Sequence, residues 1–134
     1  MKYLCLVYYN EAAMQERGGE HWQSLNGECI AFGTPLRESG QILDGAALQP
    51  VATATTVRIR EGQPHITDGP FAETKEQLAG FYLIEARDLN DAIRMASQIP
   101  PARYGCVEIR PVRDIHDETA ETLPYAEALK RQGD

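Results

Sequence analysis

Two strand-like stretches carry apolar side chains on both of their faces. In residues 3–9 every position is an aromatic, aliphatic or cysteine side chain, so the two alternating faces are equally apolar. Residues 78–86 repeat this pattern, with residues 81–84 at their centre. Because successive side chains of a strand point to opposite sides of a sheet, both strands are expected to be covered on both faces.

Between these strands the spacing of apolar residues changes from two to three or four. A helix is expected over residues 21–39, with one apolar stripe facing the core, although Gly33 and Pro35 are unfavourable inside it. The stripe consists of Trp22, Leu25, Cys29, Phe32 and Leu36. Residues 10–19 are polar and predict a loop before this helix. A second helix is expected after Asp88, a favourable N-cap, and ends before a Pro-Pro pair.

Four shorter strands complete the pattern. Residues 41–48 predict a strand that bends at Asp44-Gly45. Residues 54–60 and 64–67 predict a hairpin, and residues 106–112 predict the last strand. The order is therefore β-α-β, an inserted hairpin, and β-α-β. This order is typical of an α+β fold with ferredoxin-like βαββαβ topology, in which both helices lie on one face of an antiparallel sheet.

The uncovered apolar face of the predicted sheet indicates that the protein self-associates. Two helices on one face leave the other face open, yet the two strands at 3–9 and 78–86 are apolar on both faces. The open face is expected to meet the sheet of a second subunit related by two-fold symmetry. We therefore expect a homodimer.

Length and charge narrow the functional classes. The 134 residues fit one domain, with a core of about residues 1–113 and an acidic, then amphipathic tail at 114–134 that predicts a short helix. The net charge of −7 argues against a nucleic-acid partner. Without a membrane span or a signal peptide, a cytoplasmic protein with no membrane contact is expected. The three cysteines are far apart and are expected to be reduced, buried thiols.

The stretch at residues 67–77 (TDGPFAETKEQ) combines turn residues with a high density of charge. The Asp-Gly-Pro sequence that starts at Asp68 favours a tight turn. Glu73, Lys75 and Glu76 then fall within four positions, which is more charge than a simple connection needs. We therefore expect a functional site near Asp68.

This stretch, extended to TDGPFAETKEQLAGFYLIEA, resembles the signature of the DGPF-motif branch of the YCII-related family. The segments MKYLCLVYYNE, LQPVATATTVRIREG and IPPARYGCVEIRPV resemble the same branch, so the resemblance covers roughly residues 1–112. It implies a ferredoxin-like fold in the dimeric α+β barrel superfamily. It further implies that some wider relatives resemble lyases with a His/Asp pair, and that some DGPF proteins are associated with extracytoplasmic-function sigma factors.

The histidines give little sign of metal chemistry. His21, His65 and His116 show no spacing typical of a metal site. No glycine-rich phosphate loop or nucleophile motif occurs either, so neither a metal nor another cofactor is expected. Only His21, near the start of the first predicted helix, corresponds loosely to the histidine of the lyase-like relatives.

Asp68 is the first candidate for catalysis. At a turn that ends a strand it could act as a general base or anchor a polar ligand, or it could simply accept backbone hydrogen bonds in an Asx turn. Glu73 and Lys75 could line the mouth of a pocket, or they could belong to a solvated turn.

Strand residues supply further candidates for substrate binding. Tyr8 and Tyr82 could offer hydroxyl groups to a cavity between helices and sheet, or they could be packing residues. Arg110 could bind a substrate carboxylate bidentately, or it could pair with a neighbouring strand.

Two functions are compatible with these residues. The first is a lyase-like enzyme that abstracts a proton or eliminates a group from a small polar or aromatic compound, with Asp68 as base. The alternative is a ligand-binding or regulatory module without chemistry, linked to sigma-factor signalling as the resemblance implies. The sequence leaves open whether the protein is an enzyme.

Overall fold

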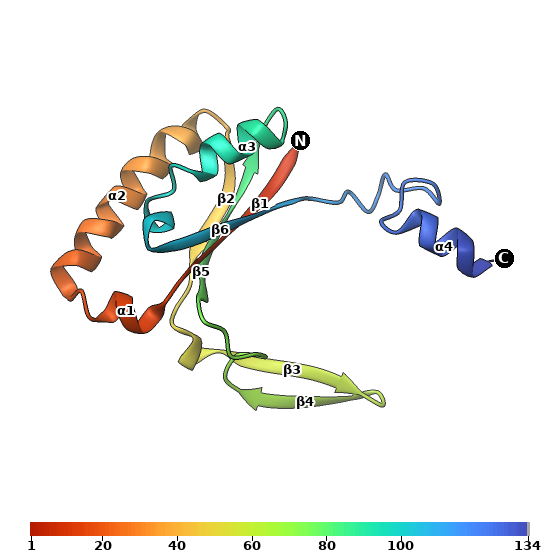
Figure 1. Cartoon of the computed structure of the whole chain (residues 1–134), viewed down its shortest axis with the longest axis horizontal. Coiled ribbons are helices and arrows are strands. Elements are labelled where there is room, and N and C mark those ends of the chain that lie inside the picture. The colour runs from red at the N-terminus through yellow and green to blue at the C-terminus, as the bar shows by residue number, and fades with distance from the viewer. Residues whose placement is uncertain (134) are drawn as a thin grey trace.

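Strand β1 (Lys2–Tyr9) is one of the two central strands of the sheet, because it pairs along both of its edges. β5 (Gln77–Glu85) lies antiparallel on one side and β6 (Gly105–Pro111) lies antiparallel on the other. β2 (Ile42–Ala47) pairs with the far edge of β5, which gives the strand order β2-β5-β1-β6. Figure 1 shows this sheet in a computed structural model that describes residues 1–133, with the backbone alone at 131–133.

Two helices pack on the same face of the sheet. α2 (Gly19–Glu38) follows β1, and α3 (Leu89–Ala96) connects β5 to β6 through the 3-10 turn η2 (Pro100–Tyr104). Residues of both helices contact one core made by β1 and β5. The predicted ferredoxin-like α+β topology is thereby confirmed (Figure 1).

The side chains of β1 alternate between a buried face and an open face. Tyr3, Cys5 and Val7 are at most 3% exposed and belong to the core beneath the helices. The opposite face, which we call the open face, carries half-buried side chains from β1 and β5: Leu4, Leu6, Tyr8, Phe81 and Leu83. The chain itself therefore covers the apolar side chains of β1 and β5 on the helix side of the sheet only.

Local signals set the ends of both main helices. α2 ends in a Schellman motif, in which Gly40 has a φ of +79° and the backbone N–H of Gln41 donates to the carbonyl of Leu36 at 2.9 Å. Asp88 caps α3 as predicted, because its carboxylate accepts a hydrogen bond from the backbone N–H of Asp91 at 2.9 Å. The predicted bend in β2 is also present, as a register shift between Ile42 and Asp44.

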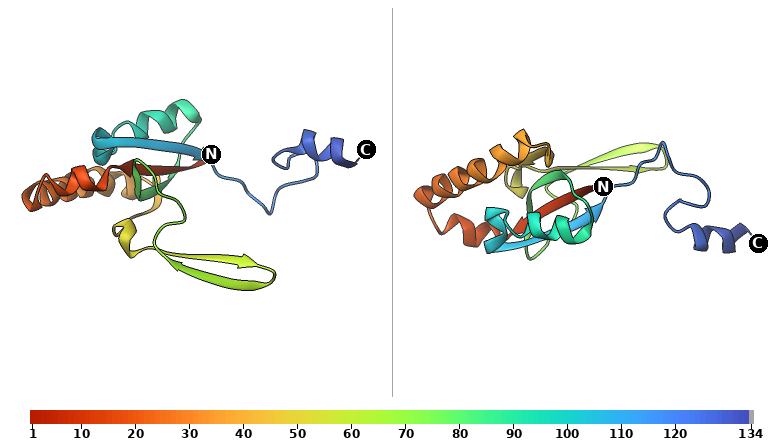
Figure 2. Two further views of the ribbon diagram at one scale, coloured as in Figure 1. Left: turned by 60° about the horizontal axis from the view of Figure 1, so that its bottom comes forward. Right: turned by 90° about the horizontal axis from the view of Figure 1, so that it is seen from above.

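The inserted segment forms a long hairpin that stands away from the sheet (Figure 2). β3 (Thr55–Arg60) and β4 (Gln63–Asp68) pair antiparallel and follow the 3-10 turn η1 (Val51–Thr53). The two connecting residues, Glu61 and Gly62, have φ values of 52° and 77°, the signs required by a type I′ turn.

One face of this hairpin is apolar and exposed. Val57, Ile59 and Ile66 are 58%, 58% and 70% exposed. Val57 pairs with Ile66, and Thr55 pairs with Asp68 two residues along, so Asp68 lies on the same face as the aliphatic side chains. We call this the apolar face of the hairpin.

The expected loop at residues 10–19 is wrong in its first half, where the chain forms α1 (Glu11–Gln15). The side chain of Asn10 accepts a hydrogen bond from the backbone N–H of Ala13 at 2.8 Å, and Met14 is only 1% exposed. An N-cap and one buried anchor therefore fold a segment whose composition is mostly polar.

The expectation that all three thiols are buried is also wrong. Cys5 is buried, but Cys29 is half-buried and Cys106 is exposed. Cys106 pairs with Tyr8 on the edge strand β6, where its side chain faces the open face rather than the core.

Beyond β6 the chain leaves the sheet and ends in α4 (Ala126–Gly133), the predicted terminal helix (Figures 1 and 2). The last residue of the predicted tail, Asp134, lies outside the described residues. Within residues 1–133, no helix has the length and apolar composition needed to cross a bilayer.

Candidate functional site

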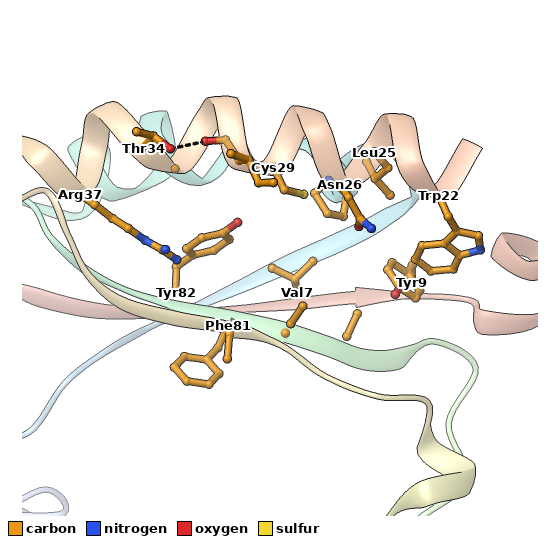
Figure 3. A pocket seen from close by; sticks show the side chains of 17 residues that line it. Val7, Tyr9, Trp22, Leu25, Asn26, Cys29, Thr34, Arg37, Phe81 and Tyr82 are labelled. Carbon is orange, nitrogen blue, oxygen red and sulfur yellow. Dashed lines mark hydrogen bonds between the residues drawn. The ribbon is translucent and has the colours of Figure 1, made fainter. Parts of the chain in front are cut away.

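A groove runs between α2 and the sheet, over β5 and the edge strand β2. Its volume is about 500 Å³, within the range of about 300–1,000 Å³ that is usual for small-molecule sites. Figure 3 shows the side chains that line it from above and below. The residues that α2 contributes on one helical face are Trp22, Asn26, Cys29, Gly33 and Arg37. Tyr9 and Tyr82 are the main polar residues that the sheet contributes.

Helix geometry explains why these α2 residues meet the same space. They recur at spacings of four, three, four and four, so they form one stripe along about four turns. A neighbouring stripe holds α2 to the core, since Leu25 is 2% exposed and both Phe32 and Leu36 pack against buried residues. α2 is therefore fixed along one stripe, and the next stripe overhangs the strands.

Two glycines shape the groove. Gly33 is buried, yet a Cβ atom placed there would have no atom within 4 Å, so the missing side chain leaves room in the middle of the groove. At Gly45 a Cβ atom would come within 2.9 Å of the Phe81 carbonyl oxygen and 3.0 Å of the Tyr82 ring. Gly45 therefore lets the Tyr82 ring lie against β2.

Aromatic rings line both ends of the groove. Tyr9 and Trp22 contact edge to face with ring centroids 5.9 Å apart. Phe32 and Tyr82 make a similar contact at 5.7 Å. Such pairs hold ring orientations, so the groove keeps flat apolar surfaces against which a planar ligand can pack. Figure 3 shows Phe81 pointing away from the groove, toward the open face.

The ionisable groups in the groove are hydrogen-bond donors at neutral pH. Burial raises the pKa of Tyr9, and the nearby Glu11 and Cys29 raise it further. Burial likewise raises the pKa of Tyr82, with Cys29 adding to the rise and Arg37 opposing it. Burial also raises the pKa of the Cys29 thiol. The two phenols and the thiol therefore remain protonated.

A second, smaller cavity of about 360 Å³ continues the groove at its Trp22 end. Tyr9, Trp22 and Asn26 line both spaces. The second space adds the carboxylate of Glu11, which accepts hydrogen bonds from the backbone N–H of Val51 at 2.9 and 3.3 Å. Glu11 therefore fixes the connection between β2 and the hairpin beside the groove.

The structure separates the residues expected to form a site. Tyr82 lines the groove. Tyr8 and Arg110 lie on the open face, where Tyr8 pairs with Cys106 and Arg110 pairs with Leu4. Glu73 and Lys75 are exposed in the irregular loop that follows the hairpin. That loop is tied to the end of β1 through the Asn10 side chain, which donates to the Lys75 carbonyl at 3.2 Å.

Asp68 ends β4 and is exposed. Its side chain makes no hydrogen bond with any described residue, while the following Gly69 donates its backbone N–H to the Ala54 carbonyl at 2.7 Å. The Asx turn that would explain Asp68 as a purely structural residue is therefore not formed. Asp68 also lies outside the residues that line the groove of its own chain.

His21 lies on α2 outside the residues that line the groove. Its ring contacts Tyr104 edge to face at 5.2 Å, and its Nε2 atom is buried without a hydrogen-bond partner among the described residues. Within residues 1–133, no cluster of three or more His, Cys, Asp or Glu residues is arranged to hold a metal ion.

Most of the groove was not predicted from the sequence. Trp22 and Cys29 belong to the predicted core stripe, and Gly33 was only an unfavourable residue inside the predicted helix. The available signal was the second stripe of α2, in which Asn26 and Arg37 share a face with Gly33. No close contact in the structure requires a glycine at this position.

The absence of an Asx turn at Asp68 predicts that its truncation changes stability less than truncation of the helix cap Asp88 does. Asp68→Ala should change the free energy of unfolding by less than about 0.5 kcal/mol, because no hydrogen bond is lost. Asp88→Ala is the matched control and should cost about 1 kcal/mol, because it removes the N-cap of α3. Urea denaturation of both variants checks this. A loss at Asp68 as large as that at Asp88 would restore a structural role for Asp68.

Comparisons with known proteins agree with this fold. The model of the YCII-related domain matches residues 1–116. An uncharacterised protein of Rhizobium meliloti (strain 1021) is 35% identical over 114 residues, covering 84% of this chain and 92% of that protein. A solved structure, 5-chloro-2-hydroxyhydroquinone dehydrochlorinase from Burkholderia phenoliruptrix AC1100 in complex with 2,5-dihydroxybenzoquinone, has a TM-score of 0.53 and 13% identity, covering 88% of this chain and all of that one. The DGPF branch stays a prediction, but the chain belongs to the YCII-related family.

Proposed function

We propose that this protein binds a small planar compound, aromatic or quinone-like, in the groove between α2 and the sheet, and that it acts on this compound by proton abstraction or elimination. The observation that carries the proposal is the groove itself. It has the volume of a ligand site and aromatic residues at both ends, and two of these residues, Tyr9 and Tyr82, are protonated hydrogen-bond donors. A groove of this composition matches the general form of small-molecule sites, which are mostly apolar with a few placed polar groups.

A structural neighbour supports the choice of ligand. The dehydrochlorinase of similar fold was solved with 2,5-dihydroxybenzoquinone, a planar ring that carries several oxygen atoms. At 13% identity this likeness concerns the fold alone, so the reaction is carried over only as a proposal. Elimination on such a ring needs a base to take a proton and donors to stabilise the oxygen that gains charge.

The donors of this reaction can be assigned within the groove. Tyr9 and Tyr82 keep their protons at neutral pH and could donate hydrogen bonds to an oxygen that becomes negative. We retain Asp68 as the proposed base. Because Asp68 lies outside the groove of its own chain, this role requires either a second copy of the chain or a rearrangement of the hairpin.

A non-catalytic binding module is the second candidate, and one observation favours it. Among the described residues that line the groove there is no Asp, Glu, His or Lys. The carboxylate of Glu11 in the adjoining cavity already accepts hydrogen bonds from the backbone N–H of Val51, so a single chain places no unengaged carboxylate or imidazole in the groove. Such a module would bind its ligand without converting it, whereas the enzyme would form a product. Chromatography of the ligand after incubation with the protein separates these two candidates.

We also propose that the protein is a homodimer. The open face carries half-buried apolar side chains that neither helix covers, and the apolar face of the hairpin is exposed. An isolated two-stranded hairpin is at best marginally stable in water, so a second copy that covers both surfaces would stabilise it. Since Asp68 shares the apolar face with Ile66, the same contact would enclose Asp68.

Light scattering tests the dimer. We expect about twice the chain mass of 14.9 kDa. Leu6→Lys should shift the protein toward monomer, because the new charge lies at the centre of the open face. Ile115→Lys, at a position that is 68% exposed beyond β6, is the control and should leave the mass unchanged. A wild-type protein that is monomeric at all concentrations would refute the dimer.

A pair of glycine substitutions on α2 tests the groove as the binding site. Gly33→Leu places a side chain in the open space of the groove, whereas Gly27→Leu places the same side chain on an exposed part of the same helix. Both should stabilise α2 by up to about 0.8 kcal/mol, because glycine is unfavourable inside helices. With 2,5-dihydroxybenzoquinone as the probe, calorimetry should find that Gly33→Leu weakens binding at least about tenfold and that Gly27→Leu has no effect.

If Gly33→Leu folds and binds the probe as tightly as the wild-type protein does, the ligand does not occupy the groove.

A further inference from the structure

Arg37 lies in the last turn of α2, at the end of the groove opposite Trp22. Its side chain extends across the groove toward Tyr82 (Figure 3). Within residues 1–133, four other arginines form ion pairs with carboxylates, but Arg37 takes part in none of these pairs. The Arg37 guanidinium also donates no hydrogen bond to another described residue, and the side chain is exposed at the mouth of the groove, so its donors can reach a ligand.

The space next to Arg37 is open. Gly33 lies one turn earlier on the same face. Apart from the adjacent backbone of α2 itself, no atom lies within 4 Å of the position that its Cβ would take. The neighbouring hydroxyl of Thr34 donates to the Ile30 carbonyl at 2.8 Å, so it is occupied within its own helix. A ligand ring that lies over Gly33 would have Tyr82 on its other side and the guanidinium at its edge.

The charge of the groove is opposite to that of the whole protein. The chain has a net charge of −7, yet the groove is lined by Arg37 and by no described carboxylate. The carboxylate of Glu11 lies in the adjoining cavity at the opposite, Trp22 end. Its other ionisable groups, Tyr9, Tyr82 and Cys29, are protonated. A neutral ligand would leave this cation without a counterion, and an anionic ligand would supply one.

We propose that Arg37 binds an anionic oxygen group, a carboxylate or an ionised hydroxyl, carried by the aromatic ring that occupies the groove. This inference rests on the proposed small-molecule function of the groove and adds a selection between anionic and neutral rings. The planar fork of a guanidinium matches a carboxylate in shape and donates two parallel hydrogen bonds. Arg37 is thus a specificity-determining residue at the Tyr82 end of the site.

Two probes of the same shape and different charge test this inference. 4-Hydroxybenzoate and 4-hydroxybenzamide are titrated into the full chain by calorimetry and by the fluorescence of Trp22, the only tryptophan of the chain. We expect the wild-type protein to bind the benzoate at least about tenfold more tightly, since hydrogen bonds between charged groups are the stronger kind. Arg37→Gln should remove this preference, and Arg37→Lys should retain part of it.

Arg17→Gln is the matched control. It removes the same single positive charge, but the Arg17 guanidinium lies over the Tyr104 ring at 4.5 Å, outside the groove. It should keep the preference for the benzoate if the effect comes from direct contact. Urea denaturation shows that each variant is folded.

The outcomes separate the two proposals. Equal affinity of the wild-type protein for both probes, or an unchanged preference in Arg37→Gln, would refute the role of Arg37 and leave the groove as a binding site. An equal loss of preference in Arg17→Gln would assign the effect to net charge and would also refute it. If neither these probes nor 2,5-dihydroxybenzoquinone bind, the proposed function of the groove fails, and the role of Arg37 fails with it.

Discussion

The site depends on how α2 packs on the sheet: one stripe of the helix contacts the core, and the adjacent stripe does not. Leu25, Phe32 and Leu36 hold the helix to the core, and the adjacent stripe has no layer beneath it except β5 and the edge strand. A larger side chain at Gly33 would fill this space. The groove is therefore formed by the same helix that covers the core, and the buried residues of β1 belong to that core.

The fold could be predicted from sequence because its signals are local and periodic. The apolar alternation of β1 and β5, the cap at Asp88 and the presence of the hairpin each depend on a few neighbouring residues. The hairpin turn was expected at residues 61–63, and it takes only Glu61 and Gly62 because Gln63 pairs with Arg60. The groove could not be predicted in the same way, because it is a space between α2 and β5, which pack together only in the fold. Tyr82 was a candidate because its hydroxyl could face a cavity between helices and sheet. Arg37 was missed because the face that it shares with Asn26 and Gly33 indicates a groove only once α2 is placed over the sheet.

The structure also divides the proposed chemistry between two parts of the chain. The groove provides aromatic surfaces, protonated phenols and a cation, which suit a ligand with negative oxygen atoms. The carboxylate proposed as base, that of Asp68, is exposed on a hairpin that stands away from the sheet (Figure 2). It makes no hydrogen bond with any described residue. In one chain the groove and the proposed base therefore lie apart. Assembly with a second copy is the simplest way to bring a base to the groove.

The central claim is that the groove between α2 and β5 is the functional site. A crystal structure of the protein soaked with 2,5-dihydroxybenzoquinone tests this claim most directly. The account predicts density for the ring between Gly33 and Tyr82, with an oxygen atom within hydrogen-bond distance of the Arg37 guanidinium. Density for the ring on the hairpin beside Asp68, or on the open face, with none in the groove, would contradict it.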